Sequence, residues 1–560
     1  MFPSRRSLLS LLLLGAFLAS AGSAQEPASP PVFGELLEVE VVNVDVFVTD
    51  RDGQPVVGLT KDDFELLADG KPVPIEFFSA PPPGASFVPY PGTPGTLPEE
   101  GVAPPPARPT LVVYVDNLNL TGGRRNEALR HLEGLIEDRM KTGHRAMVAV
   151  FDRSLRILTP VTDDLRAVRG AFAEIARTTP RAAQRQAQEQ RLKLDLEQIT
   201  PADFVPALVE QIEWFAQEEA QDTRQALIAL TDLMGTLAGV EGAKVVFLVS
   251  GGVSTEPGRT LWDAFDRRYG GTFGSQGDRR RAGDLDADYV RRELVKVTRA
   301  AQASRALIYA VDAGVRGPIM DAGEVGSEIA SGGTPGEFAQ VEASSNIGSI
   351  ADRSGGRRLL SGPDLPDTLG TVAREIASAY SLGFTPAPDR ADRMRDITVR
   401  VKQEGLRVRH RDGYWRRTSD QQLADTALAA ASLGGADNPL GALLEVSVGE
   451  RAGRRKEREV KALVRLPVPS LTLMPNGNGH AGKLAFEFAV RDEEGRVSRF
   501  EKREQTFSIP AEKLAAAAKQ SIAYGIEMHL APGSYTLATA VLDAVGGVRS
   551  TATIGFRVEK

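Results

Sequence analysis

The chain contains no cysteine among its 560 residues. It can therefore form no disulfide bond, bind no metal through thiolate, use no thiol nucleophile and carry no bacterial lipoprotein anchor. Histidine is scarce as well, and no two of the five stand at the spacing that zinc hydrolases use. The hydrolase elbow G-x-S-x-G is also missing, because Ser250 is followed by two glycines. These absences exclude the common thiol, zinc and serine hydrolase chemistries.

Long apolar runs are absent beyond the first residues, so no membrane-spanning helix is expected in the mature chain. Residues 1–24 have the pattern of an export signal: Arg5 and Arg6, the apolar run Leu8–Leu18, and small residues ending at Ala24. An uncleaved anchor is disfavoured because the apolar run is short and interrupted by a glycine. The arginine pair leaves both general and twin-arginine export open. We expect an exported protein, periplasmic or extracellular.

Charge of neither sign dominates the chain. The net charge is −7, and removal of the signal with Arg5 and Arg6 would take it to about −9. Nucleic acid is not expected as a partner at that balance. The hydrophobic fraction of 42% is ordinary for a globular protein, but 560 residues are too many for a single core.

The hydrophobic pattern divides the chain into several parts. Strands of continuous Val, Leu and Ile, such as Leu111–Val115 and Lys244–Val249, alternate with helical segments such as Arg125–Met140. This pattern predicts a mainly parallel sheet covered on both faces. The expected organisation is a signal peptide (1–24), a small β module (35–80), a Pro/Gly-rich linker (81–108), an α/β domain (109–416), a second linker (417–437) and an antiparallel β-sandwich of immunoglobulin-like type (438–560).

Several segments occur in an order that is similar to a known family. They are Val48–Phe64, Leu111–Leu120, Gly242–Gly252, Ala351–Gly356, Tyr380–Pro386 and Arg407–Tyr414. Together they resemble the secreted bacterial von Willebrand factor type A-related proteins of acidobacterial type, over roughly residues 38–415. The resemblance implies a Rossmann-like von Willebrand A-type domain.

The resemblance also implies a metal site, which this chain carries in degenerate form. In the family the first strand ends Asp-x-Ser-x-Ser, and the carboxylate and hydroxyls help to hold Mg²⁺. Here Asp116 is kept, but Leu118 and Leu120 replace the two serines. Thr223 fits the family's threonine before a helix, and Ser250 stands where the family has a second aspartate.

The degenerate set predicts weak metal binding at most. Asp116, Thr223, Ser250 and Asn119 are the candidate ligands, and only Asp116 is charged. A single carboxylate with neutral oxygens displaces the hydration shell of Mg²⁺ poorly. We therefore expect no cofactor, and favour the interpretation that Asp116 caps a loop or meets a helix N-terminus.

Three functional hypotheses remain open, the first being favoured. It is a non-enzymatic exported binding or adhesion-type protein with an unknown protein partner. The candidate contact surfaces are the insertions 181–222 and 255–288 and a rim formed by Asp116, Asn117, Thr223 and Ser250. The second is a structural or assembly scaffold of the cell envelope, in which Leu118 and Leu120 would be packed against neighbours. The third is a hydrolase using Asp116, which would need an enclosed pocket with several perturbed ionisable groups.

Overall fold

The computed structural model describes residues 41–81, 109–198, 205–269, 277–314, 335–386, 393–434, 437–452, 457–477, 479–499 and 502–559. The expected signal peptide and all but the first residue of the expected linker 81–108 lie outside these ranges. Within them, no helix is long and apolar enough to cross a membrane.

A six-stranded sheet forms the centre of the α/β part, in the order β10-β9-β8-β5-β6-β7. Neighbouring strands are parallel except β6 and β7, which form an antiparallel edge. The strands are β5 (Thr110–Asp116), β6 (Arg145–Phe151), β7 (Leu155–Thr162), β8 (Lys244–Ser250), β9 (Ala306–Asp312) and β10 (Arg357–Leu360). Every residue of β5, β6 and β8 is buried, as continuous apolar strands in a covered sheet require.

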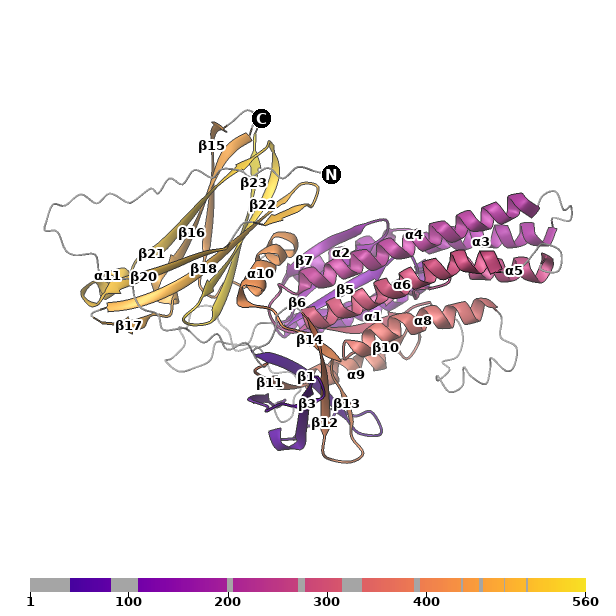
Figure 1. Cartoon of the computed structure of the whole chain (residues 1–560), viewed down its shortest axis with the longest axis horizontal. Coiled ribbons are helices and arrows are strands. Elements are labelled where there is room, and N and C mark those ends of the chain that lie inside the picture. Colours follow the sequence, from indigo (N-terminus) through magenta and orange to yellow (C-terminus); the bar gives the residue numbers. More distant parts are fainter. Residues whose placement is uncertain are drawn as a thin grey trace. The chain divides into compact units, whose positions relative to one another are not determined.

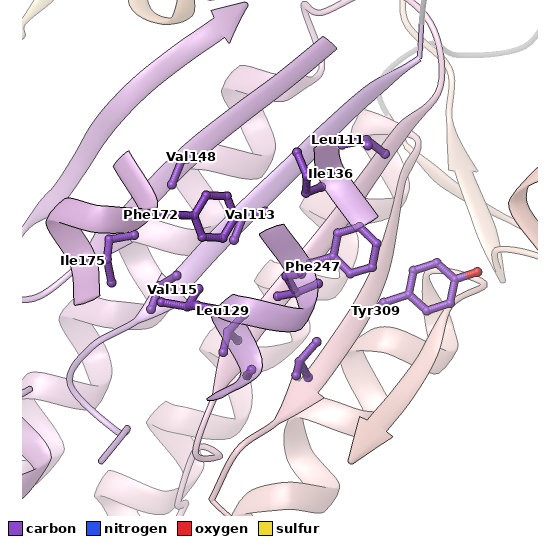
Figure 2. Close-up of a cluster of buried hydrophobic side chains, with 14 of the residues drawn as sticks. Leu111, Val113, Val115, Leu129, Ile136, Val148, Phe172, Ile175, Phe247 and Tyr309 are labelled. Atoms are coloured by element: carbon purple, nitrogen blue, oxygen red, sulfur yellow. The ribbon is translucent and has the colours of Figure 1, made fainter. Parts of the chain in front are cut away.

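Helices cover both faces of this sheet (Figure 1). One face packs against α1 (Gly122–Lys141), α2 (Leu165–Arg177) and α9 (Leu365–Ala377). Figure 2 shows this core, with Leu129 and Ile136 of α1 and Phe172 and Ile175 of α2 facing the strand residues. The other face packs against the second half of α4 (Val205–Leu237), α6 (Gly277–Ser304) and α8 (Pro335–Arg353). The predicted α/β class with a covered, mainly parallel sheet is confirmed.

Three helices build an apolar cluster of their own, which we call the helical arm. It consists of α3 (Arg181–Gln198), α5 (Arg259–Tyr269) and the first half of α4, which run side by side (Figure 1). Its core is separate from both sheet cores and contains Leu192, Leu196, Leu208, Ile212, Phe215, Leu261 and Phe265. The arm falls within the two insertions that the sequence marked as contact surfaces.

The small β module is built from two distant parts of the chain. One sheet has the order β13-β1-β11-β4 and the other β14-β12-β2-β3. The strands are β1 (Val42–Thr49), β2 (Phe64–Ala68), β3 (Lys71–Pro72), β4 (Phe77–Ser79), β11 (Tyr380–Phe384), β12 (Met394–Val401), β13 (Arg407–Arg409) and β14 (Gly413–Trp415). The strand pairing therefore assigns β11, β12, β13 and β14 to this module, and not to the α/β domain as the sequence pattern suggested. Although β12 and β13 follow each other in the chain, they do not pair as a hairpin and belong to different sheets.

The C-terminal part contains two antiparallel sheets around one core. The first consists of β15 (Leu443–Ala452), β16 (Glu457–Pro467) and β21 (Ser521–Leu530). The second consists of β17 (Met474–Asn476), β18 (Gly479–Asp492), β19 (Val497–Arg499), β20 (Arg503–Pro510), β22 (Gly533–Asp543) and β23 (Val548–Val558). Phe486 of β18 stacks on Tyr524 of β21 with ring centroids 4.6 Å apart, which joins the two sheets.

Residues 417–437, expected to be a linker, contain the helix α10 (Ser419–Leu433). Thr418 and Gln421 form a capping box at its start. Its alanine-rich face packs on alanines of β18 and β22, including Ala485 and Ala538. Small side chains on both surfaces allow this close packing. Composition alone does not distinguish such an alanine-rich helix from a linker.

The buried Lys244 at the start of β8 allows the fold to be tested by the pH dependence of stability. Its side chain is buried and donates a hydrogen bond to the backbone oxygen of Val240 at 2.6 Å. Burial, with the charges of Arg305 and Arg411 adding to it, lowers the pKa of Lys244 to about 7 from 10.5. Between these values the unfolded chain binds more protons than the folded chain, so this lysine makes stability rise with pH.

We expect Lys244→Met to be more stable than the wild type at pH 7 and below, because it removes a desolvated cation. The advantage should shrink steadily above pH 7 and nearly vanish close to pH 10.5, where the lysine loses its proton in the unfolded chain as well. Urea unfolding from pH 6 to pH 10 measures this difference. Lys519→Met, at an exposed position, is the matched control and should show no such slope. If the difference in unfolding free energy between Lys244→Met and the wild type stayed constant with pH, the lowered pKa of Lys244 would be contradicted.

Candidate functional site

The candidate site lies at the carboxyl edge of the sheet, where β5 ends in Asp116 and the neighbouring β8 ends in Ser250. Ser250 Oγ donates a hydrogen bond to Asp116 Oδ2 at 2.8 Å. Asn119 Nδ2 donates to the same oxygen at 2.8 Å, and the backbone N–H of Leu118 donates to Oδ1 at 3.2 Å. Both carboxylate oxygens are thus hydrogen-bonded within the chain.

Glycine after Ser250 allows the two strand-end loops to come together. A Cβ on Gly251 would stand 1.9 Å from the backbone oxygen of Asn119, so no larger residue fits there. The following Gly252 has φ +107°, in the region that other residues rarely adopt. The Ser-Gly-Gly sequence is therefore explained by this close approach of backbones.

Arg185 of the helical arm completes the network. Its Nη2 donates to Asn119 Oδ1 at 2.6 Å, so a guanidinium is connected through one amide to the buried carboxylate. Burial raises the pKa of Asp116, while the hydrogen bonds from Asn119 and Ser250 and the charge of Arg185 oppose that rise. The arm is also held through its backbone, because the N–H of Arg181 donates to the oxygen of Asn117 at 3.2 Å.

The residues present do not fit the Mg²⁺ that the family resemblance implies. Leu118 and Leu120 are buried in the two opposite sheet cores and supply no oxygen. The Asp116 oxygens and the Asn119 amide oxygen already accept hydrogen bonds, one of them from a cation. Within the described ranges, no three carboxylate or imidazole groups are arranged to hold a metal ion. The positive charge that reaches this network is the guanidinium of Arg185, through Asn119.

Of the four predicted ligands, the structure joins Asp116, Asn119 and Ser250. Thr223 is buried on α4, 3% exposed, and no hydrogen bond of the described chain links it to the other three. The predicted binding rim is also buried, with Asp116, Asn117, Thr223 and Ser250 between 1% and 4% exposed. These residues cannot form a surface for a partner, because the loops and the arm cover them.

A second arginine stabilises the residue that follows Asp116. Arg125 of α1 is 1% exposed and its Nη1 donates to Asn117 Oδ1 at 2.5 Å. Its Nη2 donates to the backbone oxygen of Thr178 at 2.9 Å. A hydrogen-bonded guanidinium of α1 thus also fixes the loop after β5.

Sequence reasoning missed Arg125, Arg185 and Asp312. Asp312 ends β9 in register with Ser250, is 1% exposed, and lies 3.9 Å from Arg358 Nη1. Because Asp312 is the last residue of an apolar strand, the sequence could have predicted it at this edge. The sequence could not have predicted the two arginines, because their partners are remote in sequence and an arginine on a polar helix is ordinarily exposed.

A small cavity of about 80 Å³ lies beside this network, at the base of the arm. Its polar lining pairs internally: Arg181 lies 3.6 Å from Asp222 and 4.0 Å from Glu218. Glu219 accepts a hydrogen bond from the backbone N–H of Gly258 at 2.8 Å, and burial raises its pKa. The cavity is well below the roughly 300 Å³ of small-molecule sites, so it has room for water only.

Comparisons with known proteins identify no close relative. No family model and no curated protein matches the chain. Among solved structures, proximal thread matrix protein 1 from the mussel byssus aligns at 9% identity and TM-score 0.22, over 49% of this chain and 49% of that one. BatB from Bacteroides thetaiotaomicron aligns at 10% and 0.20, over 48% and 97%, and the PilB minor pilin from Streptococcus sanguinis at 10% and 0.25, over 50% and 63%. At these scores the alignments carry no argument about function.

The absence of a fitting metal site predicts that stability does not respond to divalent cations. We expect the unfolding midpoint to stay unchanged in millimolar Mg²⁺ or Mn²⁺, since a ligand must bind the native state to stabilise it. Asp116→Ala should lower the free energy of unfolding by about 1–3 kcal/mol, because it leaves buried donors without an acceptor. That loss should be the same with and without metal.

Asp138→Ala, at a side chain that is 76% exposed, is the control and should have little effect. A rise in the wild-type midpoint with Mg²⁺ that Asp116→Ala abolishes would overturn the conclusion on metal.

The link between arm and sheet edge predicts energetic coupling between Arg185 and Asn119. In a double-mutant cycle of Arg185→Ala and Asn119→Ala, we expect a coupling of about 1 kcal/mol or more, as for hydrogen bonds to charged groups. Chemical unfolding of the four proteins measures it. Arg191→Ala, exposed on the same helix, is the matched control and should be additive with Asn119→Ala. Additivity of Arg185 and Asn119 would mean that the observed bond contributes nothing.

Proposed function

We propose that this chain is an exported, non-enzymatic binding protein that contacts another protein in the cell envelope or outside the cell. In this proposal the α/β part is a von Willebrand A-type domain and the C-terminal part an immunoglobulin-like sandwich. The order of family-like segments and the covered, mainly parallel sheet support the first assignment. Two antiparallel sheets around one core support the second.

The exposed Trp214 of the helical arm is the observation that carries the proposal. Its side chain is 70% exposed on α4, while Ile212 and Phe215 of the same helix are buried in the arm core. A tryptophan contributes a large apolar surface, and tryptophan is enriched among the residues that dominate protein interfaces. We therefore take this tryptophan, left in solvent on a helix with its own core, as the candidate contact residue for a partner protein.

The closed sheet edge supports the arm as the place of contact. The residues of the predicted rim are buried and hydrogen-bonded, so they offer no free group to a partner. Arg185 ties the arm to that edge through Asn119. The proposed contact is therefore independent of metal, and the sheet edge acts as the rigid support of the arm.

The proposal includes no reaction. The cavity beside the network is too small for a substrate, and at its wall Arg181 pairs with Asp222 at 3.6 Å. No nucleophile with an adjacent base was found on this edge from the sequence. A binding role is the simplest function consistent with these groups.

A scaffold of the cell envelope is the second candidate. The packing of Leu118 and Leu120 into the sheet cores is what that hypothesis expects. In that case the β module and the sandwich would serve as spacers or docking units, and Trp214 would have no partner.

Capture of envelope proteins on the immobilised mature protein tests the binding proposal. We expect capture to persist in EDTA and to be lost in Trp214→Ala, without any change in the unfolding midpoint. Leu443→Ala, which removes a side chain that is 61% exposed on the sandwich, is the matched control and should capture normally. Equal capture by wild type, Trp214→Ala and Leu443→Ala would reject the arm as the contact surface and favour the scaffold.

A further inference from the structure

The outer face of α4 combines an aromatic ring with two carboxylates. Glu210, Trp214 and Glu218 are spaced four residues apart and therefore lie in one line along the helix. All three are exposed, with Trp214 at 70%. We call these three residues the acidic aromatic face. Each carboxylate is one helical turn from the ring, about 5–6 Å away at the Cβ atoms.

The charge of this part of α4 has one sign. From residue 205 to residue 223 there is no lysine or arginine. The same stretch contains Glu210, Glu213, Glu218, Glu219 and Asp222. Glu219 is turned toward Gly258 of the arm, but Glu210 and Glu213 are exposed to solvent. The exposed carboxylates of α4 favour a cationic group over an anionic one at short range.

The ring of Trp214 is available to a ligand. In the described part of the chain no aromatic ring or cation packs on it, although arginines do stack on other rings, as Arg224 does on Tyr289 at 4.2 Å. The nearest opposing charge is Arg181, whose Nη2 lies 4.0 Å from Glu218. That contact is long, and the Glu218 side chain remains 49% exposed, so its carboxylate can still accept a hydrogen bond.

We propose that the acidic aromatic face binds an arginine or lysine side chain of a partner protein. The cation would lie over the face of Trp214, where the ring quadrupole attracts it, and Glu210 and Glu218 would accept its hydrogen bonds on either side. Arginine suits this arrangement better than lysine, because its planar group stacks on the ring and donates at its edges. The inference rests on the proposed function and adds the chemistry of the partner.

The other chemistries that a surface tryptophan serves fit less well. The carboxylates would repel an acidic segment of a partner. A purely apolar partner surface would gain nothing from the glutamates on either side of the tryptophan. The two glutamates therefore determine which class of partner side chain the tryptophan receives.

Fluorescence anisotropy of labelled hexaarginine, with hexalysine and hexaglutamate for comparison, tests the inference on the intact mature protein. At low ionic strength we expect hexaarginine to bind more tightly than hexalysine, and hexaglutamate not to bind. Trp214→Leu, which keeps apolar bulk but removes the ring, should weaken hexaarginine binding about threefold to fivefold, and Trp214→Phe should weaken it less. Glu210→Gln and Glu218→Gln should each weaken binding by a similar factor.

Glu445→Gln is the control for general attraction to an acidic protein, because Glu445 is an exposed glutamate on the sandwich with its side chain 57% exposed. It should leave binding unchanged. Equal weakening by Glu445→Gln, or no weakening by Trp214→Leu, would overturn the inference, because binding would then follow net charge alone. If hexaarginine does not bind while Trp214→Ala still abolishes capture of envelope proteins, the cationic partner is rejected and the proposed function stands. If substitution of Trp214 changes neither the capture of envelope proteins nor the binding of hexaarginine, both the proposed function of the arm and the cationic partner are rejected.

Discussion

The buried carboxylate of Asp116 is the constraint on which the sheet edge depends. A charge taken out of water must be compensated by hydrogen bonds or by opposite charge, or it takes up a proton. Here it accepts hydrogen bonds from Ser250, Asn119 and the backbone of Leu118. Arg185 adds a positive charge indirectly, by its hydrogen bond to Asn119. The ends of two neighbouring strands bond Asp116 directly, and the arm joins them through Asn119, so one hydrogen-bonded network links three parts of the α/β region.

Arginines close this edge of the sheet in a repeated manner. Arg185 reaches Asn119 after β5 from the arm, Arg125 reaches Asn117 from α1, and Arg358 of β10 stands beside Asp312 at the end of β9. Each guanidinium is supplied by a different element. The polar ends of β5 and β8, which in open α/β sheets ordinarily face a ligand, are thereby hydrogen-bonded inside the protein, whereas within the described chain Asp312 Oδ2 makes no hydrogen bond and has only the Arg358 charge at 3.9 Å. A closed edge of this kind shifts any recognition outward, onto surfaces such as the arm.

The arm is suited to such a role because it is both anchored and exposed. Its own apolar core holds α3, α4 and α5 together, and the contacts of Arg181 and Arg185 hold its base. A rigid helix loses little conformational freedom when it binds, so an exposed side chain on it can contribute its full surface. Trp214 with Glu210 and Glu218 meets that condition, whereas the buried rim residues do not.

The sequence by itself determined the alternation of strands and helices and the apolar residues Leu118 and Leu120 after the first strand, because these depend on local composition and spacing. Asp116, Asn119 and Ser250, which the family resemblance singled out as candidate ligands, lie together at one edge because the carboxyl ends of parallel strands meet there. Only the tertiary structure decided that Arg185 reaches Asn119, that Thr223 stays apart, and that β1 and β2 pair with strands beyond residue 380. These contacts join residues far apart in the chain, and their free energy depends on burial and geometry, which no local pattern of residues encodes.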